Sequence, residues 1–280
     1  MKNSNSNSNS TPNQPSIGVV IRFKNAARTL PDVLAALCAQ TVRLDRVVAV
    51  DNQSTDKSAD LLRTVGAEVI PWRRAYHHAE VLNFGLRHCP TDLVVVLSSH
   101  TVLKSPDALE RLVAAMADPR TACASCRWDG DGFYSDSISW AELKQKGLKF
   151  ASIYSNSMGI IRRSLWEQVP FDESLPTLED GAWALEQLRR GYLCRRLDVP
   201  FSYQRGGPGR DFIFALLTFQ LAARHELKVA WLGALTTLRT LARVGIDSCT
   251  GQRPAVRNPQ ALWERFRAWT AWRFVQVSQE

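Results

Sequence analysis

Two neighbouring carboxylates, Glu179 and Asp180, stand in the segment Thr177–Gly181, directly before a helical pattern that continues through Trp183 and Leu188. A carboxylate that borders a cleft can act as a general base, because it can take a proton from a hydroxyl group as that oxygen reacts. The same pair could instead only complement the positive end of the helix dipole, an effect of about 0.3–1 kcal/mol. The residues alone leave both interpretations open.

A second group of polar side chains, Asp51 to Thr55, follows the apolar run 47–50. In open α/β sheets ligands bind beyond the carboxyl ends of the strands, where a carboxylate can accept hydrogen bonds from a ribose or a base. Asp51 could also cap the following helix, and the two roles are compatible. We favour nucleotide contact for Asp51. Asn25, after an earlier strand pattern, could support the same pocket or serve only as a turn residue.

The elements that position these side chains alternate between β-rich runs and helical patterns from Ile17 onward. This alternation predicts an α/β fold with a doubly wound, mostly parallel sheet and helices on both faces. We expect strands at 17–23, 47–50, 68–70, 93–97 and 122–127. We expect helices from Thr29, between Thr55 and Gly66, through Leu82 and Leu86, and from the N-cap and first-turn pair Ser105-Pro106.

Five motifs in order resemble glycosyltransferase family 2, the nucleotide-sugar enzymes of the GT-A fold. They are Ile17–Asn25, Val48–Asp56, Asn83–Gly85, Val94–His100 and Pro170–Asp180. Each motif alone is weak, but the ordered set is specific and covers about residues 16–205. The resemblance implies inverting transfer of a sugar from a nucleotide diphosphate, with Asp180 as the general base and Glu179 beside it.

The resemblance also implies where the donor binds. It assigns the nucleotide-sugar to Asn25, Asp51, Asn83 and the segment Ser98-Ser99-His100, which follows the strand at 93–97. Trp128, in the loop after the strand at 122–127, could stack on a sugar ring of the acceptor. These residues and the acidic pair form the expected site.

Ser98-Ser99-His100 is the main departure from the family, which normally has Asp-x-Asp at this point to hold Mg²⁺ or Mn²⁺. Two negative charges are missing, and Mg²⁺ prefers carboxylate and water oxygens to imidazole. Three explanations stay open: a metal held by His100 and the substrate phosphates, with Mn²⁺ favoured over Mg²⁺; a metal-free site in which cations stabilise the leaving diphosphate; or an inactive relative. Candidate cations are Lys24, Arg73, Arg74 and Arg205. Ser-x-His variants resemble rhamnosyltransferase-like members of the family.

Length and composition fit one large domain with an appendage, because the chain has 280 residues, 45% of them hydrophobic. We expect a disordered Asn- and Ser-rich tail at 1–15, a GT-A domain at 16–206 and a helical region at 207–280. The six cysteines suggest reduced thiols of a cytoplasmic protein. Cys123 and Cys126 lack the second ligand pair that structural zinc requires. The net charge of +8 suits an anionic partner.

The C-terminal region carries two amphipathic patterns, at 232–242 and 262–273, that interleave Leu and Trp with Arg. Such helices can lie at the inner face of a membrane as a peripheral contact. They can equally pack on the catalytic domain or on a second subunit. No apolar run of the sequence reaches the ~18 residues that span a bilayer.

The leading hypothesis is transfer of a hexose or deoxyhexose to a saccharide or lipid-linked saccharide of a bacterial surface polymer. The alternative is a catalytically degenerate protein that binds sugar nucleotides or glycans. A nucleotidyltransferase would require a Gly-rich phosphate loop near the first strand, and residues 22–28 contain no glycine. Nucleic-acid binding is not expected, because the basic residues form no single run.

Overall fold

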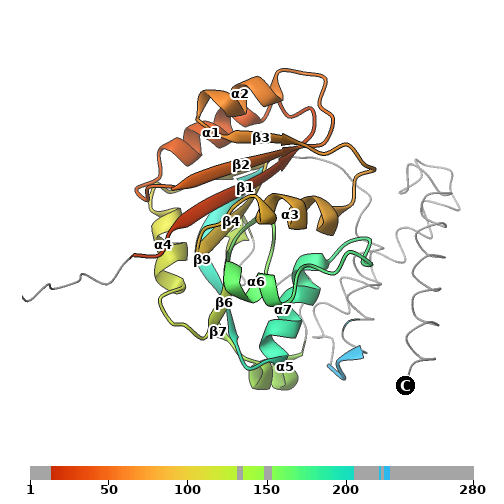
Figure 1. Cartoon of the computed structure of the whole chain (residues 1–280). Helices are drawn as coiled ribbons and strands as arrows, with labels where there is room; N and C mark the ends of the chain where they lie inside the picture. The colour runs from red at the N-terminus through yellow and green to blue at the C-terminus, as the bar shows by residue number, and fades with distance from the viewer. Residues whose placement is uncertain (1–13, 131–134, 148–152, 205–220, 222–223, 228–280) are drawn as a thin grey trace, which may run out of the picture.

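The computed structural model describes residues 14–130, 135–147, 153–204, 221 and 224–227 (Figure 1). Most of these residues, 16–204, form an α/β domain within the predicted range 16–206. The predicted tail at 1–15 and the predicted helical region at 207–280 lie almost entirely outside the described residues. Both therefore stay predictions, as does the boundary near Gly207.

A mixed sheet of nine strands runs through the described part of the domain. The strands are β1 Ile17–Phe23, β2 Arg46–Asp51, β3 Glu68–Pro71, β4 Leu93–Ser98, β5 Thr101–Leu103, β6 Thr121–Trp128, β7 Ser135–Ile138, β8 Met158–Arg162 and β9 Leu193–Tyr203. Their spatial order is β3-β2-β1-β4-β8-β6-β9-β5, with β7 paired to β9. All five predicted strands are confirmed, each within one residue of its expected bounds.

Parallel pairing covers β3-β2-β1-β4 and the β6-β9 pair. Strand β8 runs antiparallel between β4 and β6, and β5 and β7 run antiparallel to β9. The amino end of β8 therefore lies at the same edge of the sheet as the carboxyl ends of β1, β2, β4, β6 and β9. That edge gathers polar residues from distant parts of the sequence.

Helices cover both faces of the sheet (Figure 1). They are α1 Leu30–Cys38, α2 Ser58–Thr64, α3 His78–Arg87, α4 Ala108–Ala115, α5 Trp140–Lys146, α6 Arg163–Gln168 and α7 Glu179–Arg189. Alternate residues of β1 divide between two cores, because side chains of a strand point to opposite faces. Val20 packs in the core with α3, α6 and α7, whereas Val19 and Ile21 pack in the core with α1, α2 and α4.

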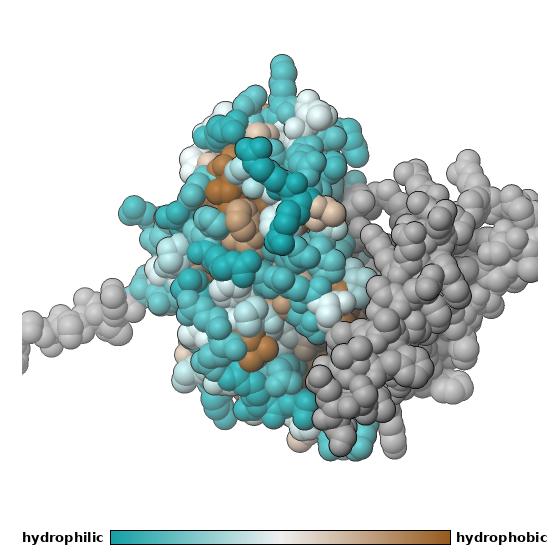
Figure 2. All heavy atoms as spheres, turned by 45° about the vertical axis from the view of Figure 1, so that its right-hand side comes forward, coloured by the Kyte–Doolittle hydropathy of each residue, from teal (hydrophilic) through white to brown (hydrophobic). Residues whose placement is uncertain are grey.

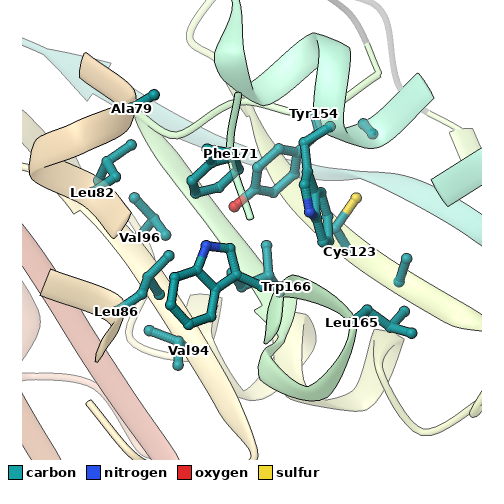
Figure 3. Packing of buried hydrophobic residues seen from close by; sticks show 14 of the residues in the cluster. Ala79, Leu82, Leu86, Val94, Val96, Cys123, Tyr154, Leu165, Trp166 and Phe171 are labelled. Atoms are coloured by element: carbon teal, nitrogen blue, oxygen red, sulfur yellow. The ribbon is translucent and has the colours of Figure 1, made fainter. Parts of the chain in front are cut away.

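The core on the α3 side supports the segment that precedes α7. Figure 3 shows Trp166 and Phe171 packed beside Leu82 and Leu86 of α3. Trp166 and Phe171 are almost completely buried, so the chain around 166–171 is fixed against α3.

One helix start differs from the prediction. Helix α4 begins at Ala108 with Asp107 as its N-cap residue, rather than at Ser105-Pro106. The backbone N–H of Ala108 donates to the carbonyl of Ser105, and the hydroxyl of Ser105 donates to the carboxylate of Asp107. These two bonds close a turn before the helix, so the predicted cap belongs to that turn.

The described surface is largely hydrophilic on the face shown in Figure 2. Tyr76, with 39% of its surface exposed, is the one large hydrophobic residue of the described set that is classed as exposed. Among these same residues no helix has the length and apolar character needed to cross a membrane.

Candidate active site

The carboxyl edge of the parallel strands brings together the predicted donor residues. Phe23 of β1 is in register with Asp51 of β2, and Arg22 of β1 is in register with Ser98 of β4. Residues in register on neighbouring parallel strands lie side by side and point to the same face. Asp51 and Ser98 therefore lie on either side of the end of β1, at the edge where ligands bind in open α/β sheets, with their side chains on opposite faces because Phe23 and Arg22 are consecutive residues.

Asn25 and Asp51 shape the loops after β1 and β2. The side-chain oxygen of Asn25 accepts a hydrogen bond from the backbone N–H of Thr55 over 2.8 Å. The backbone N–H of Asn25 donates to the hydroxyl of Ser54 over 3.1 Å. Oδ1 of Asp51 accepts from the N–H of Ser54 over 2.9 Å. Asn25 adopts a φ of 46°, a conformation that asparagine tolerates better than most residues. The two Asn25 bonds join the loops after β1 and β2 into one rim, which is the turn role left open for Asn25. Asp51 closes a turn within its own loop and does not cap the following helix, because α2 begins at Ser58 with Lys57 as its N-cap residue.

Ser98, Ser99 and His100 lie at the end of β4, in contact with Thr29 on one side and with Tyr203 on the other. The hydroxyl of Thr29 donates to the carbonyl of Ser99 over 2.7 Å and lies 3.4 Å from Nδ1 of His100. The hydroxyl of Ser98 lies 3.4 Å from that of Tyr203, at the end of β9. Ser98 and Ser99 are buried and His100 is half-buried. The two serines of the segment are thus packed in the interior, while the imidazole of His100 is partly exposed.

The acidic pair begins α7, as predicted. Leu178 before it has a φ of 66°, a left-handed conformation that costs energy for leucine and that is often found at functional sites. Asp180 is half-buried, and its carboxylate accepts two backbone hydrogen bonds, from Asn156 over 3.0 Å and from Gly181 over 2.8 Å. The carboxylate is therefore fixed in direction while part of its surface stays open.

Burial raises the pKa of Asp180 to about 7, and the neighbouring charge of Glu179 raises it as well. The two backbone N–H donors and the positive charge of Arg22 act in the opposite direction. Near neutral pH such a carboxylate can both accept and release a proton, as a general base requires.

Glu179 is buried and faces inward, with 5% of its side chain exposed. Its Oε1 accepts a hydrogen bond from the Asn156 amide over 3.3 Å and lies 3.9 Å from Nη1 of Arg22. Glu179 is therefore tied to Asn156 and faces Arg22, and it does not share the partly open surface of Asp180.

Asn83 lies apart from the rim that Asn25 and Asp51 form. It is 1% exposed, and its side-chain oxygen accepts from Trp166 over 2.9 Å and from the N–H of Phe171 over 3.1 Å. Its amide donates to the Phe171 carbonyl over 2.8 Å and to Glu173 over 3.0 Å. Both ends of the side chain are thus engaged by the segment that leads to α7. These contacts connect Asn83 to the segment before the base and give no support to donor binding.

The residues at the end of β4 offer few ligands to a metal ion. Within the described ranges, no three His, Cys, Asp or Glu side chains gather so that they could hold a metal ion. His100 has two serines before it, and serine hydroxyls are weak ligands for Mg²⁺ and Mn²⁺ compared with carboxylates. The site residues therefore do not fit a metal held by the protein in the Asp-x-Asp manner.

The sequence profile described as "Glycosyl transferase family 2" matches residues 18–170, which is more than half of the chain. The chain belongs to glycosyl transferase family 2. The matched range includes every predicted donor residue and ends ten positions before the Asp180 carboxylate.

One curated family 2 relative is the O-antigen chain rhamnosyltransferase RfbN of Salmonella typhimurium, 26% identical over 196 residues. The match covers 63% of this chain and 62% of that relative, so the chain spans less than two thirds of the relative's length. A second is the 4,4'-diaponeurosporenoate glycosyltransferase of Staphylococcus haemolyticus, 26% identical over 110 residues, which cover 36% of this chain and 28% of that protein.

Solved structures share the fold. The mannosyltransferase PcManGT of Pyrobaculum calidifontis, in complex with GDP-Man and Mn²⁺, superposes with a TM-score of 0.63 and 19% identity, covering 92% of this chain and 81% of that one. S. aureus TarS with UDP-GlcNAc gives a TM-score of 0.57 at 14% identity, covering 74% and 66%. These similarities show the GT-A fold for this family 2 chain.

Aromatic side chains line the side of the site formed by β6 and β9. The ring of Trp128 lies 4.9 Å from that of Phe201 and 4.7 Å from that of Tyr203, measured between centroids. Tyr203 in turn lies 5.8 Å from His100. Trp128 is therefore placed at the same edge as the predicted donor residues.

Three residues of this family 2 site were missed in the sequence: Arg22, Asn156 and Tyr203. Arg22 had a detectable signal, because it is a charged residue inside the otherwise apolar strand pattern IGVVIRF. Asn156 had none, since only the antiparallel insertion of β8 brings its N–H to Asp180. Among the cations predicted instead, Lys24 and Arg73 are exposed, Arg74 pairs with Glu80 over 3.1 Å, and Arg205 lies outside the described residues.

Proposed function

We propose that this chain is an inverting glycosyltransferase with Asp180 as its general base. One observation carries the proposal: a half-buried carboxylate at the start of α7, oriented by two backbone N–H groups, has a pKa of about 7. A base is most effective when its pKa lies near the working pH, because it is then deprotonated before the reaction and basic enough to accept a proton.

The reaction follows from this base. Asp180 accepts the proton of an acceptor hydroxyl while that oxygen attacks the anomeric carbon of the donor sugar. The bond between this carbon and the diphosphate oxygen breaks, and its electron pair leaves with the nucleoside diphosphate. Attack from the side opposite the leaving group inverts the anomeric configuration. The proton then passes from Asp180 to solvent.

The donor is proposed to be a nucleotide-diphosphate sugar at the rim formed by Asn25 and Asp51. The complexes of PcManGT with GDP-Man and of TarS with UDP-GlcNAc support this class of donor. The rhamnosyltransferase relative supports a deoxyhexose and a role in surface polysaccharide synthesis of the cell envelope. Asn83 has no part in this proposal, because its hydrogen bonds are made within the core.

The acceptor is proposed to be a saccharide or a lipid-linked saccharide, with Trp128 stacking on one of its rings. The half-buried indole at the site edge supports this role, since a sugar ring can pack against an aromatic face. A cytoplasmic position with peripheral contact at the inner face of the membrane would bring a lipid-linked acceptor within reach. The amphipathic patterns at 232–242 and 262–273 support that contact.

The decisive experiment combines the Asp180→Asn variant with the anomeric configuration of the product. Asparagine keeps the shape but cannot accept the proton, so we expect transfer to fall by roughly 10²–10⁴-fold, and NMR of the wild-type product to show inversion. Calorimetry should show that the variant still binds the donor. Full activity in the variant or a retained anomeric configuration would overturn the proposal. If the wild-type protein binds the donor but transfers sugar to none of many acceptors tried, the degenerate binding protein is favoured instead.

A further inference from the structure

Arg22 places a positive charge inside the sheet, where a strand residue is normally apolar. Its side chain is 17% exposed, yet its Nη1 is buried and makes no hydrogen bond. The nearest anionic atom recorded for Nη1, Oε1 of Glu179, lies 3.9 Å away, beyond hydrogen-bond distance. A buried N–H without a partner carries a desolvation cost that an incoming anion would remove.

Glu179 lies near Arg22 without a hydrogen bond to it. Its Oε1 already accepts a hydrogen bond from the Asn156 amide, which anchors it to the turn before β8. Burial alone would lower the pKa of Arg22, but the nearby side chains Tyr76, Glu179, Tyr203 and Asp180 raise it. The guanidinium therefore stays charged, and Nη1 stays available for a ligand.

The position of Arg22 along the sheet indicates which ligand group would meet it. Phe23, its neighbour in β1, is in register with Asp51, where the nucleoside is proposed to bind. Arg22 itself is in register with Ser98 and faces the acidic pair that contains the base. In a nucleotide sugar the diphosphate lies between the nucleoside and the anomeric carbon. In the order of the strands, Arg22 of β1 likewise lies between Asp51 of β2 and Ser98 of β4, and its side chain points to the face opposite to that of Asp51, toward the acidic pair.

We propose that Arg22 and the hydroxyl of Ser98 form a binding site for the diphosphate of the donor that requires no metal ion. Arginine suits this role because its planar fork of N–H donors matches two phosphate oxygens. Serine at position 98 leaves the guanidinium free for phosphate, whereas a carboxylate in register with it would pair with it. The inference rests on the proposed function only for the identity of the ligand.

The site also has a part in the reaction. When the bond between the anomeric carbon and the diphosphate breaks, the leaving oxygen gains the electron pair and the diphosphate gains one negative charge. A fixed guanidinium beside this oxygen stabilises the charge as it develops. It also shields the donor phosphates from Glu179 and Asp180, whose charges would otherwise repel them.

The test measures binding by calorimetry in the presence of EDTA, with UDP, dTDP and GDP and with the matching nucleosides. For wild type we expect the preferred diphosphate to bind at least about tenfold more tightly than its nucleoside, and Arg22→Gln to lose about 10- to 100-fold in diphosphate affinity. Nucleoside affinity should not change. Arg22→Lys keeps the positive charge but loses the planar fork of N–H donors. Its diphosphate affinity should therefore lie between those of wild type and Arg22→Gln.

Arg87→Gln, at an exposed arginine of α3, is the matched control and should bind as wild type does. Circular dichroism shows whether each variant is folded. If Arg22→Gln does not fold, the diphosphate affinity of Arg22→Lys is compared with that of wild type instead. Diphosphate binding that EDTA abolishes and Mn²⁺ restores would overturn the inference, as would equal diphosphate affinity in Arg22→Gln. Either result leaves the proposed function standing if nucleosides still bind. Failure of wild type to bind any of these nucleotides would overturn both.

Discussion

The backbone N–H of Asn156 donates a hydrogen bond to Oδ2 of Asp180 over 3.0 Å, while the Asn156 side chain donates to Glu179. One residue at the turn before β8 thus holds both members of the acidic pair. Because β8 runs antiparallel to β4, this turn lies beside the end of β4, where the N–H of Ser98 donates to the carbonyl of Ser157 over 3.0 Å. Asp180, the proposed base, is therefore positioned by the sheet as well as by its own helix.

The pH dependence of transfer should report the base. With a pKa of about 7 for Asp180, the active, deprotonated form increases as pH rises. We expect kcat/KM to fall about tenfold per pH unit below pH 7 and to level off above it. Initial rates between pH 5 and 9 check this, with donor in excess. A profile whose break lies near 4, the usual range of a carboxylate, would contradict the assignment.

The same shift predicts how stability depends on pH. The folded pKa of Asp180 is raised from 3.8 to about 7, so between these values the unfolded chain has released the proton while the folded protein keeps it. Protonation of Asp180 therefore contributes to the free energy of unfolding, by an amount on the order of a few kcal/mol. This contribution is complete below pH 4 and is lost as pH rises through 7.

Asp180→Asn removes this titration. We therefore expect the melting temperature of the variant, relative to wild type, to increase as pH rises from 5 to 8. The hydrogen bond lost by the amide adds a constant offset that pH does not change. Melting curves at four pH values check the trend, and a difference that stays constant would show that Asp180 is charged at low pH in the folded protein.

Gly159 of β8 is expected to be essential for the position of the base. A Cβ at this position would lie 2.4 Å from Cε2 of Tyr154 and 2.8 Å from the carbonyl oxygen of Ser155. Gly159→Ala must therefore displace the backbone that leads to Asn156. We expect a loss of about 1–3 kcal/mol in the free energy of unfolding, together with at least about a tenfold loss of kcat.

Gly85→Ala is the matched control for this prediction. Its Cβ would meet Val20 at 2.7 Å and Val50 at 2.9 Å, a similar degree of overpacking in the core under α3. We expect a similar loss of stability but a smaller loss of kcat at a temperature where both variants are folded. Equal losses of kcat in the two variants would show that overpacking alone explains the effect.

Asn83 should behave as a structural residue. Asn83→Ala leaves the indole N–H of Trp166 and the backbone N–H of Phe171 without a partner, at about 1–3 kcal/mol for each buried group. Glu173→Ala removes only one exposed partner of Asn83 and should cost less than 1 kcal/mol. Urea unfolding gives both values, and calorimetry should show unchanged nucleotide affinity in folded Asn83→Ala. A stable Asn83→Ala variant that no longer binds nucleotide would restore Asn83 to the donor site.

The order of the elements was predictable because its signals are local. Apolar runs such as Leu93–Leu97 and the helical spacing around Leu82 and Leu86 depend only on near neighbours in the chain. The placement of Asp51 and Ser98 at one edge was also predictable, since the carboxyl ends of parallel strands meet there. The acidic pair at a helix start belongs to the same class of local pattern.

Local patterns along the chain were therefore sufficient for the fold class, the family resemblance and the residues at the strand ends. The tertiary structure alone decided that Asn83 turns into the core, that Asn156 holds Asp180, and that Arg22 faces Glu179. These contacts join segments far apart in the chain, and they depend on β8 entering the sheet antiparallel. No periodicity encodes such a pairing, because its free energy comes from packing and hydrogen bonds that exist only after the chain has folded.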